Sequence, residues 1–478
     1  MEYDLVVEKG RVIDPEKGTD AYLSIGIKSG MIAAISKEKL TGREVIDGSG
    51  CIVAPGFIDI HAHEDFALSA PTADEGHEGL PTQTADALLS SGVTTMVGGN
   101  CGIGAYPFRP YLERVQKTPF LLNYFSLIGY SSLRQWLGIG RYETPGPGEM
   151  DALKKMVKEG MELGFPGISF GLQYAPGTTG PEMLEMAKIV KEYDGFVAVH
   201  MRYDYPAKAR ETVEEMLEIA KATGVRLQLS HLAANVYGGD NLQNALQSIE
   251  YMNHEGFDIK GDMYPYDAWA TGIQSAVFDG DPFNIYNFTY GDLEIVTGPW
   301  AGQRCTPELY EELRELTEDT TVVCHNATPW NAIEEALQNP FVFLGSDALM
   351  TKDRVTGQIE GHPRSTGTTA RFLRLFVQDR GLLDLKTALR KMTIEPANRL
   401  KLFSKGRLQV GKDADITIFD LADLRERGEY GADACALPSR GIRYVVVGGR
   451  VVYTAEAGER FAREIAGKGK QCSLEGES

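Results

Sequence analysis

Eight short apolar runs, separated by longer segments of helical character, constrain the fold of this chain more than any other feature. Each run has the length and composition of a buried parallel strand, and the segments between them repeat apolar residues with helical spacing. The runs occupy residues 57–60, 93–97, 120–128, 166–170, 196–199, 226–229, 257–263 and 341–344, and the clearest helical segments are residues 150–163, 181–192, 208–222 and 242–255. Eight strands alternating with helices predict an α/β protein with a (β/α)8 TIM-like barrel, which places its functional site at the C-terminal strand ends.

Both ends of the chain have the pattern of β structure instead. Three hairpins are predicted, with Gly10, Gly30 and the pair Gly448–Gly449 in their turns. They would join residues 5–7 to 11–13, 23–27 to 31–35, and 444–447 to 450–453, and residues 415–419 add a further strand. We therefore expect a discontinuous β-sandwich domain, residues 1–54 and 405–470, beside a barrel of residues 55–404.

The alternation weakens at residues 270–335, which are too many for an ordinary connection between a strand and a helix. One interpretation is an insertion on the active-site side that acts as a lid. The other is a surface loop without a function. The sequence alone leaves both open.

Composition narrows the class of protein. The net charge of −19 argues against binding to nucleic acid or to an anionic membrane. Six cysteines without regular spacing in 478 residues do not resemble a disulfide framework. The first residues lack a basic region followed by an apolar core, and no apolar run is long enough to cross a bilayer. We therefore expect a cytoplasmic enzyme with a small-molecule substrate.

Two histidines end the first apolar run. His61 and His63 are two residues apart, so in an extended segment their imidazoles point to the same side. Such a pair at the end of a buried strand suits a divalent transition metal. A His-x-His sequence is common by chance, so the interpretation depends on whether other ligands lie at the other strand ends.

Four further strand ends carry a residue that can bind a metal. Each has an ordinary alternative: a buried thiol, a hydrogen-bonded core imidazole, or an aspartate that caps a helix. These residues are Cys101, His200, His231 and Asp347. Because a barrel would gather all six side chains on one face, their coincidence favours a metal site.

These positions resemble the amidohydrolase superfamily, with His-x-His after the first strand, single histidines after the fifth and sixth, and Asp after the eighth. The flanking residues are similar to the N-acyl-D-amino-acid deacylases (D-aminoacylases). The motifs that carry this closer resemblance are Gly-Asn-Cys-Gly at 99–102, His-Met-Arg at 200–202, Ser-His-Leu at 230–232, Asp-Met-Tyr-Pro-Tyr at 262–266, Gly-Ser-Asp at 345–347 and His-Pro-Arg at 362–364.

The resemblance implies a division of the six ligands. Cys101, His200 and His231 would hold one zinc ion tightly, and His61, His63 and Asp347 would frame a second, weaker divalent site. Many relatives bridge two metals with a carboxylated lysine after the fourth strand. Residues 167–172 contain no lysine, and Cys101 is the expected substitute.

The expected chemistry is hydrolysis of a C–N amide bond by hydroxide formed at zinc, with Asp347 as general base and then general acid. An acylated D-amino acid carries a free carboxylate, for which Arg364 is the candidate partner and Tyr264 a second donor. The alternative for Arg364 is a surface arginine paired with an acidic neighbour.

The chain departs from the deacylase pattern around the pocket. Ala233 stands where a lysine is common, Tyr130 replaces a usual histidine, and Tyr203-Asp204 and 267–270 are also unusual. The leading hypothesis is deacylation of N-acyl-D-amino acids. The alternatives are hydrolysis of a cyclic amide, such as a hydantoin, dihydropyrimidine or lactam, and a catalytically silent scaffold. Superfamily habit also implies a homo-oligomer.

Overall fold

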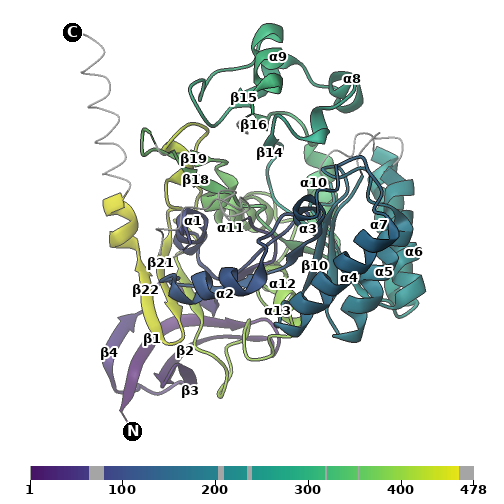
Figure 1. Ribbon diagram of the computed structural model, residues 1–478. Coiled ribbons are helices and arrows are strands. Elements are labelled where there is room, and N and C mark those ends of the chain that lie inside the picture. Colours follow the sequence, from purple (N-terminus) through teal and green to yellow (C-terminus); the bar gives the residue numbers. More distant parts are fainter. Residues whose placement is uncertain are drawn as a thin grey trace, which may run out of the picture.

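The computed structural model describes residues 2–63, 80–202, 209–233, 239–317, 320–353 and 355–461. Parallel strands and their helices form the centre of the molecule, with a mixed sheet built from both chain ends on one side (Figure 1). A small antiparallel sheet lies on the opposite side. The described residues include no helix with both the length and the apolar character needed to span a membrane.

All eight predicted apolar runs form strands, so the α/β class is confirmed. They are β6 (Phe57–Asp59), β7 (Val93–Gly98), β8 (Asn123–Ser126) with β9 (Ile128–Gly129), β10 (Gly167–Gly171), β11 (Phe196–His200), β12 (Arg226–Leu229), β13 (Ile259–Met263) and β17 (Val342–Leu344). Every pair is parallel, in the orders β6-β7-β8 and β17-β13-β12-β11-β10-β9. A parallel bridge between Ala62 and Ala348 joins the segments that follow β6 and β17.

The four predicted helical segments are also confirmed, as α4 (Pro147–Glu162), α5 (Gly180–Glu192), α6 (Ala209–Thr223) and α7 (Gly239–His254). They pack side by side on the outside of the parallel strands (Figure 1). In α5, Thr179 and Glu182 form a capping box that satisfies free backbone N–H groups at the helix start. Its buried residues Met183, Met186, Ala187 and Val190 recur at helical spacing and face the core.

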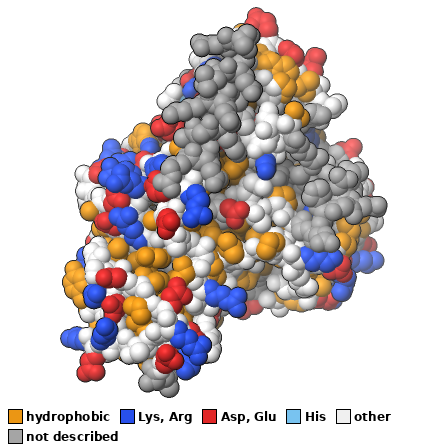
Figure 2. Space-filling view, turned by 90° about the vertical axis from the view of Figure 1, so that its left-hand side faces the viewer, with side chains coloured by type: hydrophobic (Ala, Val, Ile, Leu, Met, Phe, Trp, Pro, Cys, Tyr) orange, Lys and Arg blue, Asp and Glu red, His pale blue; other side chains and the backbone are white. Residues whose placement is uncertain are grey.

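Strands from both chain ends share one hydrogen-bonded sheet of eight strands. They are β1 (Tyr3–Asp14), β2 (Thr19–Lys28), β3 (Met31–Ser36), β4 (Gly42–Asp47), β5 (Ile52–Pro55), β20 (Ile416–Phe419), β21 (Ile442–Val447) and β22 (Arg450–Thr454). The order is β22-β21-β20-β5-β1-β2-β3, with β4 on β1. Because β20 pairs antiparallel with β5, the two ends of the chain meet in the middle of this sheet. On the face in Figure 2, acidic, basic and apolar side chains are interspersed.

The predicted hairpin at Gly10 is wrong, because β1 continues through it as one strand. The pairing of β1 with β2 is only irregular between Val7 and Gly10, where Lys9 has φ of 61°. A Cβ on Gly10 would lie 2.3 Å from Val53 Cγ2, so this glycine allows β5 to approach closely. The hairpins at Gly30 and Gly448–Gly449 are confirmed by the pairs Lys28–Met31 and Val447–Arg450.

Residues 269–324, here called the small-sheet segment, have regular structure of their own. It contains β14 (Trp269–Gly272), α8 (Pro282–Tyr286), β15 (Leu293–Ile295), α9 (Pro307–Glu315) and β16 (Thr321–Cys324). The antiparallel sheet has the order β14-β16-β15, and the segment forms the top of the molecule in Figure 1. Neighbouring aromatic rings, including those of Trp269, Phe278 and Phe288, form its core.

The remaining α-helices and strands complete the connections. They are α1 (Gln83–Ser90), α2 (Phe108–Lys117), α3 (Tyr130–Trp136), α10 (Trp330–Gln338), β18 (Met350–Lys352), β19 (Ile359–Gly361), α11 (Arg364–Phe372), α12 (Leu385–Met392) and α13 (Ile394–Arg399). The helix α10 leads from the small-sheet segment back into β17, the last parallel strand.

Candidate metal centre

The structure brings together all six side chains for which the sequence predicts metal binding. One group comprises His61, His63, Cys101 and Asp347, and the other comprises Cys101, His200 and His231. Within each group the ligand-type atoms all lie within 4.8 Å of one another, and every member is buried. Cys101 belongs to both groups, so its thiol lies between them.

Local backbone geometry turns three of these side chains inward. Cys101, His231 and Asp347 follow their strands with φ values of 55°, 33° and 53°, in the left-handed region that residues other than glycine rarely adopt. Non-glycine residues held there often mark functional sites. Each of these residues therefore stands at an unusual backbone position two or three residues beyond the end of its strand.

The first group is held by carboxylates. His63 Nε2 lies 2.7 Å from Asp347 Oδ1, and His61 Nε2 lies 3.4 Å from both that oxygen and Cys101 Sγ. The other ring nitrogen of His61 donates to Asp262 Oδ1 at 2.9 Å. Asp262 also accepts from the backbone N–H of His231, so one buried carboxylate orients two ligand-type residues. Sequence reasoning quoted the motif containing Asp262 but gave it no role.

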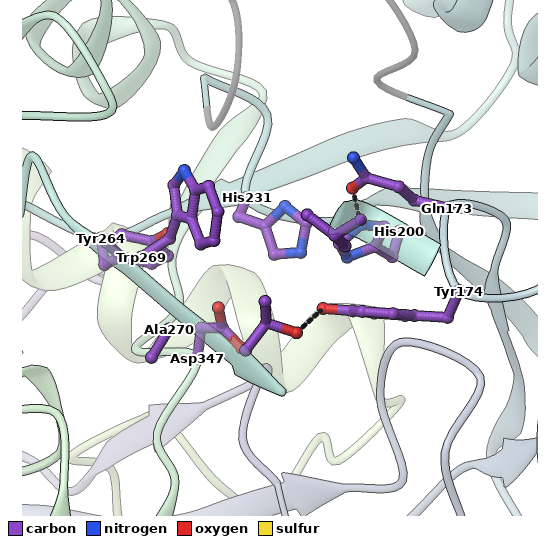
Figure 3. A pocket seen from close by; sticks show the side chains of 10 residues that line it. Gln173, Tyr174, His200, His231, Tyr264, Trp269, Ala270 and Asp347 are labelled. Atoms are coloured by element: carbon purple, nitrogen blue, oxygen red, sulfur yellow. Dashed lines mark hydrogen bonds between the residues drawn. The ribbon is translucent and has the colours of Figure 1, made fainter. Parts of the chain in front are cut away.

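The second group is bonded to a neutral side chain, the amide of Gln173. Cys101 Sγ lies 3.6 Å from His231 Nε2, and the rings of His200 and His231 meet edge to face with centroids 4.5 Å apart. His200 Nε2 donates to Gln173 Oε1 at 2.7 Å (Figure 3). Sequence reasoning missed Gln173, whose only signal is its place just after β10, at the same strand ends as the predicted ligands.

Electrostatics favour a thiolate and a carboxylate in this cluster. Burial alone would raise the pKa of the Cys101 thiol, but the neighbouring imidazoles of His61, His200 and His231 outweigh it and hold that pKa well below its usual range. Burial likewise opposes ionisation of Asp347, and Arg364 and His61 outweigh it to keep the pKa low. A buried thiolate with neighbouring imidazoles is a donor set suited to zinc.

Arg364 lies beside this cluster rather than on the surface, so the alternative of a surface arginine is wrong. It is 2% exposed, and its Nη2 is 2.9 Å from Asp347 Oδ2. The guanidinium carbon stands 4.7 Å from the centroid of the Tyr264 ring. Among the described residues, Arg364 Nε and Nη1 and the Tyr264 hydroxyl have no hydrogen-bond partner. Three donors are therefore buried with no acceptor from the described chain.

A cavity opens onto the cluster, and the small-sheet segment forms one of its walls. The lining residues are Gln173, Tyr174, His200, His231, Tyr264, Trp269, Ala270, Thr271, Val277 and Asp347. In Figure 3 the Trp269 ring points toward His231, and Ala270 and Asp347 line the same space. Arg364 is not among the lining residues; it lies behind Asp347 and Tyr264.

The residues that depart from the deacylase pattern lie in different parts of the structure. Ala233 is fully buried near the site, whereas Tyr130 donates to Glu182 in the core between α3 and α5. Asp267 accepts from the indole N–H of Trp330 at 3.2 Å. Tyr203 and Asp204 lie outside the described residues.

Comparison with known proteins agrees with this geometry. Residues 52–452 match the amidohydrolase family. The chain is 28% identical to the N-acyl-D-glutamate deacylase of Alcaligenes xylosoxydans xylosoxydans, covering 94% of this chain and 93% of that protein. It is also 28% identical to the D-aminoacylase of the same organism, covering 97% and 98%. The crystal structure of the N-acyl-D-glutamate deacylase of Bordetella bronchiseptica, complexed with zinc and a phosphonate mimic of the tetrahedral intermediate, superposes with a TM-score of 0.81. It is 25% identical, and the match covers 95% of this chain and 97% of that one.

Proposed function

The chain belongs to the amidohydrolase family, and we propose that it is a zinc-dependent hydrolase that removes the acyl group from N-acyl-D-amino acids. The observation that carries the proposal is the buried cluster of six ligand-type side chains, which opens onto a cavity beside unsatisfied Arg364 and Tyr264 donors. The relatives named as deacylases of N-acyl-D-amino acids support the substrate class.

In this proposal Cys101, His200 and His231 hold zinc, and His61, His63 and Asp347 frame a second, weaker divalent site. Bound zinc lowers the pKa of water and polarises a carbonyl oxygen. Asp347 is the general base: its carboxylate accepts the proton of the attacking water and later delivers it to the leaving nitrogen. The C–N bond breaks, the water oxygen joins the acyl carbon, and the amino acid leaves with the proton. The low pKa of Asp347 keeps it ionised, which is the form that a general base needs.

Arg364 and Tyr264 are proposed to bind the substrate carboxylate. The unsatisfied Nε and Nη1 of Arg364 can pair with a carboxylate, and the Tyr264 hydroxyl adds a third donor. Because Arg364 also contacts Asp347, the same guanidinium would connect the substrate carboxylate to the proposed base.

We also propose the finer architecture expected from the sequence. The two parallel sheets would form the (β/α)8 barrel of residues 55–404, with an insertion at about 270–335. The mixed terminal sheet would be the core of a β-sandwich domain of residues 1–54 and 405–470. The bridge between Ala62 and Ala348, with the hydrogen bond from Asp347 N to His61 O at 2.7 Å, supports closure between β6 and β17.

The cellular setting is likewise a proposal. A cytoplasmic location, a small-molecule substrate without nucleic-acid or membrane partners, and a homo-oligomer follow from composition and family habit. The net charge of −19 supports the exclusion of anionic partners.

The test is hydrolysis of paired N-acetyl-D- and N-acetyl-L-amino acids by the zinc-loaded protein, with Arg364→Ala and Arg371→Ala in parallel. Arg371 lies on the same helix but pairs with Glu426, so its variant is the matched control. We expect turnover of D-substrates only, a raised KM in Arg364→Ala and little change in Arg371→Ala. No turnover of either enantiomer by metal-loaded protein would contradict the proposal, and cyclic amides would be tested next. Absence of bound metal would favour a silent scaffold.

A further inference from the structure

Gln173 occupies a position between the metal centre and the small-sheet segment. It lies two residues beyond the end of β10 and is 3% exposed. Its carbonyl oxygen accepts from His200 Nε2 at 2.7 Å, and its amide nitrogen donates to the hydroxyl of Tyr286, the last residue of α8. One buried amide thus contacts a ligand-type imidazole and the small-sheet segment at the same time.

The hydrogen-bonding chemistry of the Gln173 amide fixes the tautomer of the His200 imidazole. A carboxamide oxygen can only accept, so His200 Nε2 must carry the proton in this hydrogen bond. The lone pair of His200 is then on Nδ1, the ring nitrogen through which this tautomer could bind a metal. Partners of this kind set both the tautomer and the orientation of a metal-binding histidine.

The adjacent residue makes a second, independent link of the same kind. The Tyr174 ring packs on His200 with centroids 4.5 Å apart, and its hydroxyl accepts from Thr271 Oγ1 at 3.1 Å (Figure 3). Thr271 belongs to β14, the first strand of the small-sheet segment. The backbone also contributes, because Leu172 N donates to His200 O at 2.9 Å. His200 is therefore held by residues 172–174, two of which are bonded to the small-sheet segment.

We infer that Gln173 is a positioning residue that couples metal binding at His200 to the order of the small-sheet segment through Tyr286. The inference rests on the metal site of the proposed function but does not depend on the substrate. Coupling is reciprocal: if the segment holds Gln173 in place for His200, then metal bound at His200 stabilises the segment by the same factor. Since this segment also lines the cavity, metal loading and the shape of one cavity wall would change together.

The variants separate the two ends of the amide. Gln173→Met keeps the size of the side chain and removes both hydrogen bonds, whereas Gln173→Glu keeps an acceptor for His200. Tyr286→Phe removes only the hydroxyl at the far end. Tyr142→Phe is its matched control, because the Tyr142 hydroxyl also bonds to the segment, at Asp279, without contacting Gln173.

The experiment measures two quantities without substrate: zinc affinity by competition with a chelator, and hydrogen exchange of residues 282–295 with and without zinc. We expect zinc to slow exchange there in the unaltered protein. Gln173→Met should lose about 10–100-fold in zinc affinity, and the zinc-dependent protection should disappear. Gln173→Glu should restore affinity to within about threefold of the unaltered protein, since the acceptor remains.

Tyr286→Phe gives the sharper result because it leaves the contact with His200 intact. We expect it to reduce the zinc-dependent protection and to lower zinc affinity by a matching factor, while Tyr142→Phe changes neither. Identical behaviour of the two Phe variants, or a folded Gln173→Met that binds zinc as tightly as the unaltered protein, would overturn the inference. If the unaltered protein binds no zinc, the proposed function itself fails, so the two failures are distinguishable.

Discussion

The two ends of the parallel strands bury charged groups for different purposes. At the C-terminal ends, six ligand-type side chains and Arg364 contact one another beside the cavity. At the N-terminal ends, buried or half-buried cations bond to backbone carbonyls, to single carboxylates or, for Lys260, to the side-chain amide oxygen of Asn253. These are Arg226, Lys260, Lys391 and Arg399. The contrast indicates that one end is built for chemistry and the other for holding strands and helices together.

Two cations at the N-terminal ends of the parallel strands connect helices to strands. Lys391, on α12, donates to the carbonyls of Asn339 and Val342 at 2.5 and 2.8 Å, where the chain enters β17. Arg399, on α13, donates to Asp258 Oδ1 at 2.9 Å, just before β13. Each cation ties a C-terminal helix to the start of a parallel strand. Substitutions at the C-terminal ends should therefore lower activity, whereas substitutions at the N-terminal ends should lower stability.

The largest effect should come from His231→Ala. Loss of His231 from the Cys101–His200–His231 group should abolish the zinc binding proposed there and lower kcat/KM by more than roughly 10⁴-fold, because nucleophile activation and carbonyl polarisation would both depend on the metal. Zinc content and hydrolysis of an N-acetyl-D-amino acid measure the effect. The control is His254→Ala, at an exposed residue at the end of α7. Full zinc content in His231→Ala would remove His231 from the ligand set.

Asp347→Asn should separate proton transfer from metal binding. The amide keeps the shape of the side chain but cannot accept a proton, so kcat should fall by about 10³-fold. Zinc at Cys101, His200 and His231 should remain, because Asp347 is not in that group. Measuring kcat and zinc content on one preparation tests both statements. Near-normal turnover by the zinc-loaded variant would exclude Asp347 as the general base.

The sequence predicts the C-terminal ends better than the rest of the molecule. The eight apolar runs became strands because burial on both faces leaves a continuous apolar pattern. The ligand-type residues are predictable because each follows such a run within four residues, and parallel strands bring their ends together. Cys101, His200 and Asp347 could be identified from the pattern of strands, without a prediction of any loop conformation.

The parts that sequence reasoning missed depend on contacts between distant residues. In the small-sheet segment, Trp269 pairs with Cys324 across more than fifty residues, and nothing local in either strand indicates its partner. The glycine at position 10 predicts a turn, but the structural reason for it is the close approach of Val53. Gln173 and Asp262 act on His200 and His61 through hydrogen bonds that only the fold brings into range.

Lys391→Met should affect stability and leave activity unchanged, the reverse of the changes at the C-terminal ends. The carbonyls of Asn339 and Val342 would lose their donor, at a cost of about 1–2 kcal/mol in the free energy of unfolding. Below the unfolding transition, kcat/KM should stay within about twofold, since Lys391 is not among the residues that line the cavity. Urea unfolding and hydrolysis assays provide the two readouts. A large loss of activity in a folded variant would show that the two ends are not independent.

The same variant should also change the dependence of stability on pH, which is the smallest effect. Burial lowers the pKa of Lys391 from 10.5 to about 8. Between these values the unfolded chain keeps the proton while the folded protein releases it, so stability rises with pH in this window. The gain from Lys391 between pH 7 and pH 9 should be about 1 kcal/mol, and it should be absent in Lys391→Met. Taking the difference between the two proteins at each pH removes the contribution of all other groups. A constant difference from pH 7 to pH 9 would mean that Lys391 stays charged, and that its two carbonyl partners fully offset the cost of its burial.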